Sequence, residues 1–412
     1  MVSMKPSADP QESSPRRLVL SVYLPSVVMA FGQGLLLPIL PLYARAFDAS
    51  YALIGVFLAG ESLGMLSGDV PAGLLVRRWG TKRVMLLGGA CVLSGVLAMT
   101  WAQSLTEAIL YRFLSGAGMA LWGIARHAYI ATVIKTERRG RSIAVLGGMG
   151  RVGAFVGPAV GGSVGLVYGL RAPFVLYAGL GLVALAAVRI WVVEIRTPDR
   201  VQSTAQPLGG IIREHWAVLL SAGSGQLLGQ MIRRARQVII PLYAADIVGL
   251  DVQSVGLVIS ISSALDMLMF LPAGLVMDRF GRKFAYVPSF IIQGVGMLLI
   301  PLTASFGTLL AVCCLIGLGN GLGSGTMLTL GADLAPRDAR GEFLGLWRFI
   351  GDAGSAGSPI IIGSMAEALG LVFTPFLMTA VGLGGAAVLG LTVPETLKRR
   401  PAAGVKPGSE PC

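Results

Sequence analysis

Two stretches of this chain repeat each other, PAGLLVRRWGTK at residues 71–82 and PAGLVMDRFGRK at residues 272–283. The same offset of 201 residues carries Pro158 onto Pro359 without a gap. A register kept over most of each half indicates that a whole structural unit was duplicated. Two similar halves in an apolar chain are typical of transporters that bind their substrate between the repeats.

The composition is that of a membrane protein. Hydrophobic residues make up 54% of the chain and charged residues 13%, against about 25% charged residues in soluble domains. Glycine accounts for 57 of 412 residues, and glycine allows membrane helices to pack closely. The four cysteines have neither the spacing of a zinc site nor that of a disulfide framework. We therefore expect no metal centre and no cofactor.

Twelve apolar segments follow one another, and each has the length of about 20 helical residues that crosses a bilayer. They lie at 18–43, 52–76, 84–103, 107–134, 142–168, 171–193, 216–247, 252–277, 284–304, 307–334, 343–368 and 371–392. The sequence predicts an all-α membrane protein with twelve transmembrane helices in two pseudo-symmetric six-helix bundles. Its expected parts are an N-terminal tail (1–17), a first bundle (18–193), a central linker (194–214), a second bundle (215–393) and a C-terminal tail (394–412).

Basic residues concentrate in the connectors on one side of the predicted membrane. That side holds Arg77, Arg78, Lys82, Arg83, Lys135, Arg138, Arg139, Arg141, Arg279, Arg282 and Lys283, whereas the opposite connectors hold Arg45 and Arg171. The positive-inside rule then places these loops and both termini in the cytoplasm. We assign the net charge of +12 to this topology, and expect a protein of the cell membrane with no nucleic-acid partner.

The repeated loop resembles the signature loop of the major facilitator superfamily. Its defining positions are Gly274, Asp278, Arg279 and Gly281 in the second half, and Gly73, Arg77 and Gly80 in the first. In the superfamily, the acid of this loop holds a charge cluster that stabilises one transport state. Because Arg77 fills the acidic position in the first half, the resemblance does not extend to a latch there, and we weigh Asp69 as a substitute acid for that half.

Two helix patterns extend the resemblance to essentially the whole chain. The fourth segment carries Arg112-x-x-Ser115-Gly116-x-Gly118, which is similar to a superfamily pattern. The fifth carries Gly153-x-x-x-Gly157-Pro158-x-x-Gly161-Gly162, which is similar to the pattern of the drug/proton antiporter branch. The resemblance implies alternating access, proton coupling at Arg112, and a bend at Pro158 that seals the cavity. Pro359 implies a matched bend in the second half.

Polar side chains form stripes through two of the apolar segments. The fourth segment holds Arg112, Ser115, Met119, Trp122 and Arg126 on one face, the seventh holds Gln226, Gln230, Arg233 and Gln237, and the first contributes Gln33. A charge at mid-membrane costs about 2.5–3.5 kcal/mol, so such stripes predict a water-filled substrate cavity. Alternatively, these side chains bond to neighbouring helices and hold the bundle together.

Two acids lie well inside the predicted membrane, Glu61 in the second segment and Asp266 in the eighth. Burial makes a carboxylate retain its proton up to near-neutral pH, which proton coupling requires. We therefore predict that both acids carry protons; the alternative is that both stay ionised as partners of cavity arginines. Arg348 and Asp352, four residues apart on one helix, are expected to pair with each other.

The energy source and the cargo follow from these features. The sequence contains no Walker A motif, which argues against ATP as the energy source, and no nucleophile–base pair that would indicate an enzyme. We expect a monomeric secondary transporter that exports small lipophilic organic compounds in exchange for protons. Because arginines outnumber acids in the stripes, organic anions or metabolites are the alternative cargo. A non-transporting membrane sensor or assembly factor with the same fold is the remaining alternative.

Overall fold

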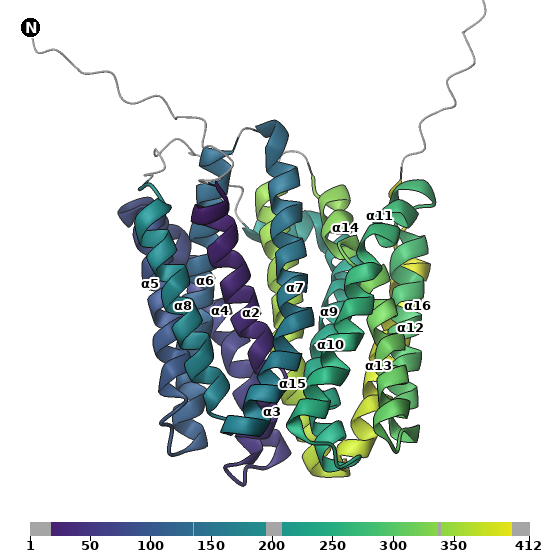
Figure 1. The fold of residues 1–412 in the computed structure, drawn as a ribbon. Helices are drawn as coiled ribbons and strands as arrows, with labels where there is room; N and C mark the ends of the chain where they lie inside the picture. Colours follow the sequence, from purple (N-terminus) through teal and green to yellow (C-terminus); the bar gives the residue numbers. More distant parts are fainter. Residues whose placement is uncertain (1–17, 135, 195–207, 337–338, 398–412) are drawn as a thin grey trace, which may run out of the picture.

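The computed structural model describes residues 18–134, 136–194, 208–336 and 339–397, and no strand occurs within these ranges (Figure 1). The predicted N-terminal tail, most of the predicted linker and the end of the predicted C-terminal tail lie outside them. Each half of the described chain forms one helical bundle, and the two bundles stand side by side. Both ends of the described chain lie at the same end of the molecule, called the terminal end here; the opposite end is the distal end.

The helices agree with the predicted all-α fold of two six-helix bundles. The first half contains η1 (Val19–Tyr23), α2 (Leu24–Leu36), α3 (Ile39–Arg45), α4 (Tyr51–Trp79), α5 (Thr81–Ala98), α6 (Leu105–Val133), α7 (Thr136–Tyr168) and α8 (Ala172–Trp191). The second half contains α9 (Leu208–Asp246), α10 (Val252–Leu268), α11 (Phe270–Arg279), α12 (Lys283–Leu299), η2 (Ile300–Leu302), α13 (Phe306–Leu322), α14 (Thr326–Leu334), α15 (Arg340–Leu369), η3 (Leu371–Phe373) and α16 (Thr374–Thr392).

Some predicted segments are built from two successive helices. The first segment is interrupted at Leu37 and Pro38, between α2 and α3, because proline cannot donate the backbone hydrogen bond that a continuous helix needs. The tenth segment is interrupted before α14 at Gly325, which has a φ of 76°. That left-handed conformation is readily adopted only by glycine.

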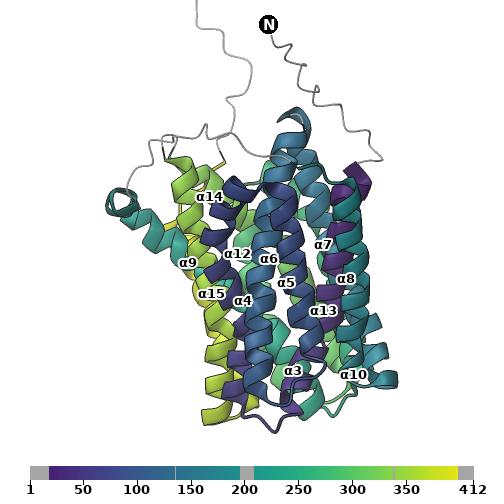
Figure 2. The same cartoon turned by 90° about the vertical axis from the view of Figure 1, so that its left-hand side faces the viewer.

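The last part of the predicted linker is helical. Residues 194–214 were expected to form a connector, but α9 already begins at Leu208. The helix then bends at His215, whose φ of −113° and ψ of 18° are not helical. The turns before the bend project sideways from the bundle at the terminal end (Figure 2).

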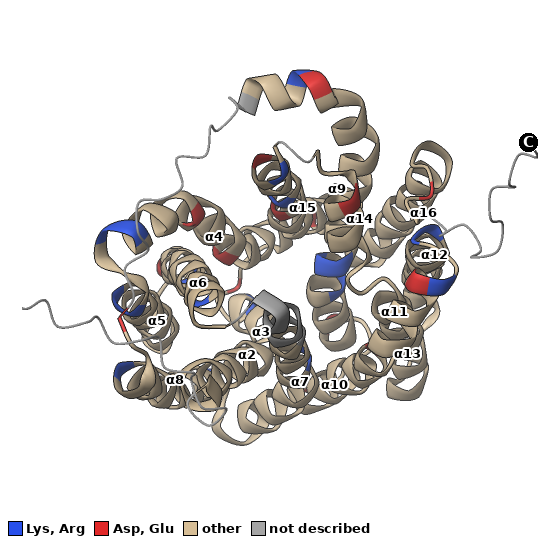
Figure 3. Ribbon diagram, turned by 90° about the horizontal axis from the view of Figure 1, so that it is seen from above, with Lys and Arg blue, Asp and Glu red and all other residues tan. Residues whose placement is uncertain are grey.

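Ten helices within the described residues are long and apolar enough to cross a membrane by length and composition. The remaining two long helices, α9 and α15, carry polar residues such as Gln226, Gln230 and Asp352 inside their spans. The loops at the terminal end are basic: Arg77 and Arg78 close α4, and Lys283 opens α12. Figure 3, which looks onto this end, shows basic residues near the ends of α4, α5 and α12.

The two bundles meet along two seams that the repeat relates to each other. In one seam α4 packs on α15, and in the other α7 packs on α10. A Cβ atom on Gly55 of α4 would overlap the carbonyl oxygen of Pro359, and a Cβ on Gly256 of α10 would overlap that of Pro158. Glycine therefore lets backbone pack on backbone at matching positions of both seams.

Contacts between the halves close the distal end. Asp246, at the end of α9, pairs with Arg45 of α3 and accepts a hydrogen bond of 2.8 Å from the hydroxyl of Tyr51. The backbone N–H of Tyr51 donates to Glu367 Oε2 at 3.0 Å. All three contacts join a residue of the first half to one of the second.

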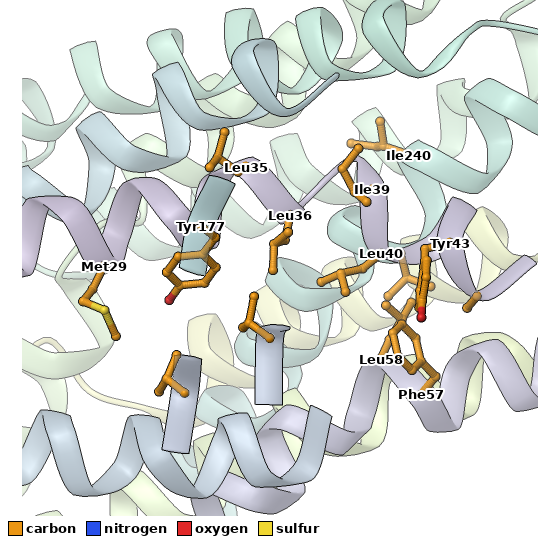
Figure 4. Close-up of a cluster of buried hydrophobic side chains, with 14 of the residues drawn as sticks. Met29, Leu35, Leu36, Ile39, Leu40, Tyr43, Phe57, Leu58, Tyr177 and Ile240 are labelled. Atoms are coloured by element: carbon orange, nitrogen blue, oxygen red, sulfur yellow. The ribbon is translucent and has the colours of Figure 1, made fainter. Parts of the chain in front are cut away.

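Buried apolar side chains pack behind these contacts, and Figure 4 shows part of this cluster, which extends from Tyr43 and Phe57 to Tyr177 and Met29. The ring of Tyr43 lies 4.9 Å from that of Phe174 and 6.1 Å from that of Phe57, measured between ring centroids. Its hydroxyl donates to the carbonyl oxygen of Met99 at 2.5 Å. Ile39 of α3 and Ile240 of α9, from opposite halves, belong to the same buried cluster. This packing separates the interior from the distal surface.

Candidate substrate cavity and buried charge clusters

A cavity of about 220 Å³ lies between the two halves, near the middle of the helices. Its apolar wall includes Leu36, Leu37, Leu40, Leu58, Val96 and Val238. Its polar lining consists of Gln33, Glu61, Arg112, Ser115, Tyr177, Arg234 and Gln237. Most of these residues belong to the first half, and α9 supplies the contribution of the second half. The cavity thus combines an apolar surface with a group of charged and amide side chains.

Glu61 is the acid of this cavity, and donors from three other helices surround it. Arg112 Nη2 of α6 lies 2.6 Å from Glu61 Oε2, with only 6% and 11% of the two side chains exposed. Arg234 Nη2 of α9 lies 3.5 Å from the same oxygen. The amide nitrogen of Gln33 on α2 lies 3.5 Å from Oε1. The carboxylate therefore contacts a cation from each half of the protein.

Close packing of α4 on α6 places Glu61 beside Arg112. A Cβ atom on Gly116 of α6 would overlap the backbone carbonyl of Glu61, and a Cβ on Gly64 of α4 would overlap that of Phe113. Small residues at such crossings let helix backbones approach closely. The Gly116 of the fourth-segment pattern therefore has a structural role: it brings the acid and the arginine within ion-pair distance.

Asp266 lies in a second, separate charge cluster. Arg151 Nη1 of α7 donates to Asp266 Oδ1 at 2.8 Å, and Arg236 Nη2 of α9 donates to Oδ2 at 3.2 Å. Asn320 of α13 donates to Oδ2 at 2.6 Å, and Arg151 also donates to Ser324 Oγ at 2.6 Å. This carboxylate, too, contacts one arginine from its own half and one from the other.

The structure divides the predicted site residues between these two places and the bundle core. Gln33, Ser115 and Gln237 line the cavity together with Arg112 and Glu61. Asp266 belongs to the second cluster. The others lie outside the cavity lining: Met119, Trp122, Arg126, Gln226, Gln230 and Arg233.

Trp122 and Met119 were expected in the cavity, and the structure corrects this expectation. Trp122 is 1% exposed, and its ring faces Gly89 of α5. Met119 packs against the same hydrophobic core. Both side chains are mainly apolar, so burial among helices of the first bundle stabilises them more than contact with water.

The remaining polar residues of the stripes lie against neighbouring helices or hydrogen-bond to them. Gln226 and Gln230 lie against α15 at Gly351. Arg233 Nη2 donates to the carbonyl oxygen of Gly323 at 2.6 Å. Arg126 Nη1 lies 3.3 Å from Ser26 Oγ on α2. For these residues the geometry fits the alternative considered above, in which polar groups hold the bundle together.

Six residues of the cavity and the second cluster were not predicted from the sequence: Arg151, Tyr177, Arg234, Arg236, Asn320 and Ser324. A signal existed for Arg151 and Arg234, because a charge inside an apolar segment is costly and needs a partner. The sequence could not say which half that partner belongs to. Tyr177 and Asn320 sit in otherwise apolar helices and gave no distinct signal.

A glutamate beyond the last helix of each half caps the loop of the signature motif. Glu194 accepts the backbone N–H of Lys82 at 3.1 Å and that of Arg83 at 3.3 Å, at the start of α5. Glu395 accepts the N–H of Arg282 at 2.9 Å and that of Lys283 at 3.0 Å, at the start of α12. A carboxylate at a helix start satisfies free N–H groups and complements the helix dipole.

The glycines of the loop make room for these caps. Gly80 has a φ of 88° and Gly281 a φ of 120°. A Cβ atom at Gly80 would overlap the carboxylate of Glu194, and one at Gly281 would overlap that of Glu395. Gly73 and Gly274 have open space at the Cβ position, so they are not needed for this contact.

In the loop of the second half the ion pair is made by Arg282 rather than by Asp278. Asp278 is exposed, and no hydrogen bond or ion pair to it is found within the described ranges. Arg282 instead binds an acid at the end of α14, with its Nε atom 3.0 Å from Asp333 Oδ2. Asp69, weighed as a substitute acid for the first half, faces Arg348 of α15 in the other half at 3.7 Å. Arg348 also contacts Asp352 at 3.4 Å, as predicted.

The fifth-segment glycines face two different neighbours. Cβ atoms on Gly153, Gly157 and Gly161 would overlap α2, inside the first half, whereas one on Gly162 would overlap α10 of the second half. Pro158 has no N–H, and the next residue, Ala159, donates its N–H to Ser260 Oγ of α10 at 2.8 Å. In the part of the chain that is described, no group of three His, Cys, Asp or Glu residues could hold a metal ion.

Comparison with known proteins agrees with this architecture. A sequence model of the Major Facilitator Superfamily matches residues 22–235 and 222–410. The chain belongs to the major facilitator superfamily. Among its relatives in this superfamily, an uncharacterized MFS-type transporter of Methanocaldococcus jannaschii is 22% identical over 86% of this chain and 92% of the relative. The multidrug resistance protein MdtH of Klebsiella pneumoniae is 26% identical over 80% of this chain and 83% of the relative.

Solved structures with low sequence identity confirm the superfamily fold. A POT family transporter in complex with a thioalcohol-conjugated peptide has a TM-score of 0.75 at 12% identity, covering 94% of this chain and 99% of that protein. A D-xylose–proton symporter has a TM-score of 0.72 at 16% identity, covering 92% and 98%. The chain is thus a member of a transporter family with two six-helix bundles.

Proposed function

We propose that this protein exports small, largely apolar organic compounds in exchange for protons, by alternating access between its two halves. The position of Glu61 carries the proposal. Its buried carboxylate lines the cavity and contacts Arg112 of its own half and Arg234 of the other half. A proton on this carboxylate would change the cavity and a contact between the halves at the same time, which is what coupling requires.

The proposed orientation has both termini in the cytoplasm, as the basic loops of the terminal end support. The distal end then faces the outside, where Asp246 bonds to Arg45 and Tyr51. In this orientation the structure corresponds to a state that is closed toward the outside. Outward release of a substrate would require these distal contacts to open.

Each coupling residue has a distinct proposed role. Glu61 binds and releases the transported proton, and Arg112 holds the ionised carboxylate in place. Asp266 is the second proton carrier, since it also contacts a cation of each half, Arg151 and Arg236. Neutralising either carboxylate removes one charge contact between the halves.

The cavity wall supports apolar cargo. Leucines and valines form most of the side of the cavity toward the distal end. Each Å² of apolar substrate surface buried against them contributes about 25 cal/mol to the free energy of binding. The relative from Klebsiella pneumoniae is described as a multidrug resistance protein, which agrees with export of such compounds.

An excess of arginine supports a second candidate, the transport of organic anions. The buried or half-buried arginines inside the bundle are Arg112, Arg126, Arg151, Arg233, Arg234 and Arg236, against the acids Glu61, Asp69, Asp266 and Asp352. Such an excess of positive charge in a region of low dielectric favours an anionic ligand. An anion that takes the place of Glu61 on the arginines would favour a proton on Glu61, so anion and proton would move in the same direction.

The experiment measures the retention of lipophilic cations, neutral compounds and organic anions in cells that express wild type or Arg112→Ala. Each measurement is made with and without a protonophore. Proton-driven export predicts lower retention in wild type, abolished by the protonophore and by Arg112→Ala. Arg189→Ala, at an exposed position of α8, serves as the matched control and should behave as wild type. Retention that the protonophore does not change would contradict the proposal.

A further inference from the structure

Arg234 differs from the two neighbouring arginines of α9 in the half that it contacts. Arg233 donates to Gly323 and Arg236 to Asp266, both in the second half. Arg234 instead reaches Glu61 at 3.5 Å and Ser62 Oγ at 3.4 Å, both on α4 of the first half. We propose that Arg234 is a positioning residue that locks the empty transporter closed at the distal end, and that a proton or a substrate at Glu61 releases this lock. This inference rests on the proposed function, in which Glu61 carries the proton.

The two arginines at Glu61 are held differently. Arg112 binds Oε2 at 2.6 Å from within the same half, so this contact moves with the first bundle as one body. Arg234 is held from its own helix, where its Nη1 donates to Gln237 Oε1 at 2.8 Å, and it shares the same carboxylate oxygen at 3.5 Å. When the halves separate, the contact of Arg234 is lost while that of Arg112 remains.

The surroundings of Glu61 make this contact depend on charge. The groups that face the carboxylate are Gln33 on α2, Arg112 on α6, Tyr177 on α8 and Arg234 on α9. With Glu61 ionised, its negative charge lies between two guanidinium groups from opposite halves. With Glu61 neutral, those two like charges remain and repel each other across the interface. Protonation therefore changes an attraction between the halves into a repulsion.

This arrangement meets a requirement of antiport. An exchanger must not change its orientation while empty, because an empty return step would let the proton gradient dissipate. The empty, ionised state is the one in which Glu61 holds Arg234. A proton on Glu61, or a substrate that fills the cavity between the two side chains, breaks the contact and permits the change. The lock thus explains how a proton and a substrate can each enable the change of orientation.

The test measures how fast a cysteine at Ile240 reacts with a membrane-impermeant maleimide added from the outside, in full-length protein in vesicles, as a function of pH. Ile240 is 3% exposed in the closed distal end. In wild type, the labelling rate should rise as the pH falls. Arg234→Gln keeps a hydrogen-bonding side chain but removes the charge, and should raise the rate at high pH about fivefold, as expected for loss of one charge contact between the halves.

Two variants make the test specific. Arg233→Gln removes the neighbouring guanidinium, which bonds within its own half, and should keep the pH response of wild type. Glu61→Gln mimics the protonated state and should label fast at every pH, with no further increase in the double variant with Arg234→Gln. Wild-type behaviour of Arg234→Gln would overturn the inference. So would a pH response of wild-type size that survives in Glu61→Gln, since it would come from the other acids that join the halves, Asp266, Asp246 and Glu367.

Transport measurements on the same vesicles separate the two proposals. If proton-driven export persists but Arg234→Gln does not change labelling, the lock at Arg234 is wrong and the proposed function stands. If export does not depend on the proton gradient, the proposed function is wrong whatever the labelling shows. If both proposals hold, Arg234→Gln should let protons leak across the vesicle membrane in the absence of substrate, whereas Arg233→Gln should not.

Discussion

Gly256 lies so close to the carbonyl oxygen of Pro158 that any side chain at this position would overlap it. The repeat places Gly55 in the same relationship to Pro359. Both contacts join helices of opposite halves, and both involve the carbonyl of a proline inside a long helix. The backbones of the two halves therefore touch at matching points of both seams, and a rocking motion between them must keep or remake these contacts.

Substitution of Gly256 by alanine should impair this motion. The added methyl group overpacks the seam, which costs about 1–3 kcal/mol and shifts the balance between the two orientations roughly 5–150-fold. Gly55→Ala should act in the same way at the other seam. The measurement is the transport rate of each purified variant in vesicles, together with its thermal unfolding midpoint in detergent.

Gly357→Ala provides the control for this prediction. Gly357 lies in α15 with open space at its Cβ position, so alanine should preserve transport and stabilise the helix by up to about 1 kcal/mol. Equal transport by Gly256→Ala and Gly357→Ala would show that the close contact is not required for the cycle.

The cap at Glu395 should make the loop before α12 sensitive to acid. Burial raises the pKa of Glu395, but the backbone N–H groups of Leu397, Lys283 and Arg282 lower it more, so its pKa lies below the ordinary value of 4.5. Because the folded-state pKa is lowered, the stabilisation is fully present above pH 4.5 and is lost as the pH falls through the lowered pKa. Glu395→Ala should cost about 0.5–2 kcal/mol at pH 7, the usual effect of losing a helix cap.

Hydrogen exchange at the amides of Arg282 and Lys283 measures this effect directly. Exchange in Glu395→Ala at pH 7 should be faster than in wild type, while the amides of Lys82 and Arg83, which Glu194 caps, should be unchanged. Unchanged protection of all four amides in the variant would mean that the cap does not stabilise the loop.

Residue patterns predicted the fold. The duplication predicted the two bundles, and the composition predicted the close helix packing that the fifth-segment glycines make with α2 and, at Gly162, with α10. Side-chain pairing across the halves was not predictable in the same way. Arg151 and Arg234 pair with acids on helices that are distant in sequence. Helical periodicity shows which residues share a face, but not which half of the protein that face packs against.

Periodicity also failed to separate the cavity from the bundle core. Trp122 shares a helical face with Arg112, yet it packs on α5 because a long helix passes different neighbours along its length. The polar residues Gln226 and Gln230 illustrate the same limit, since they face α15 rather than the cavity. A stripe of residues identifies a buried face of a helix. Whether that face lines a cavity or packs against another helix depends on how the other helices are arranged.

Gly281→Ala should destabilise the signature loop more than Gly274→Ala. Gly281 has a φ of 120°, which a side chain strongly disfavours, and its Cβ would overlap the carboxylate of Glu395. Backbone strain of this kind costs on the order of 1–3 kcal/mol. Gly274 has open space and lies within α11, so alanine should be neutral or slightly stabilising. Thermal unfolding of both variants decides the question, and equal midpoints would contradict the role assigned to Gly281.

Removal of the Asp266 charge should be strongly destabilising, because the guanidinium groups of Arg151 and Arg236 would then lie buried without an acid. Loss of one partner of a buried ion pair typically costs about 3–5 kcal/mol, so Asp266→Asn should lower the unfolding midpoint clearly. Adding Arg236→Gln restores the charge balance and should recover part of this loss, while Arg151 keeps its bond to Ser324. Arg189→Gln, exposed on α8, removes the same charge outside the cluster and should recover nothing. The result to compare is the loss of unfolding free energy in the double variant, Asp266→Asn with Arg236→Gln. If this loss equals the sum of the losses in the two single variants, the two substitutions act independently. The arginines then do not share the carboxylate, and the cluster is not the coupled unit that its distances indicate.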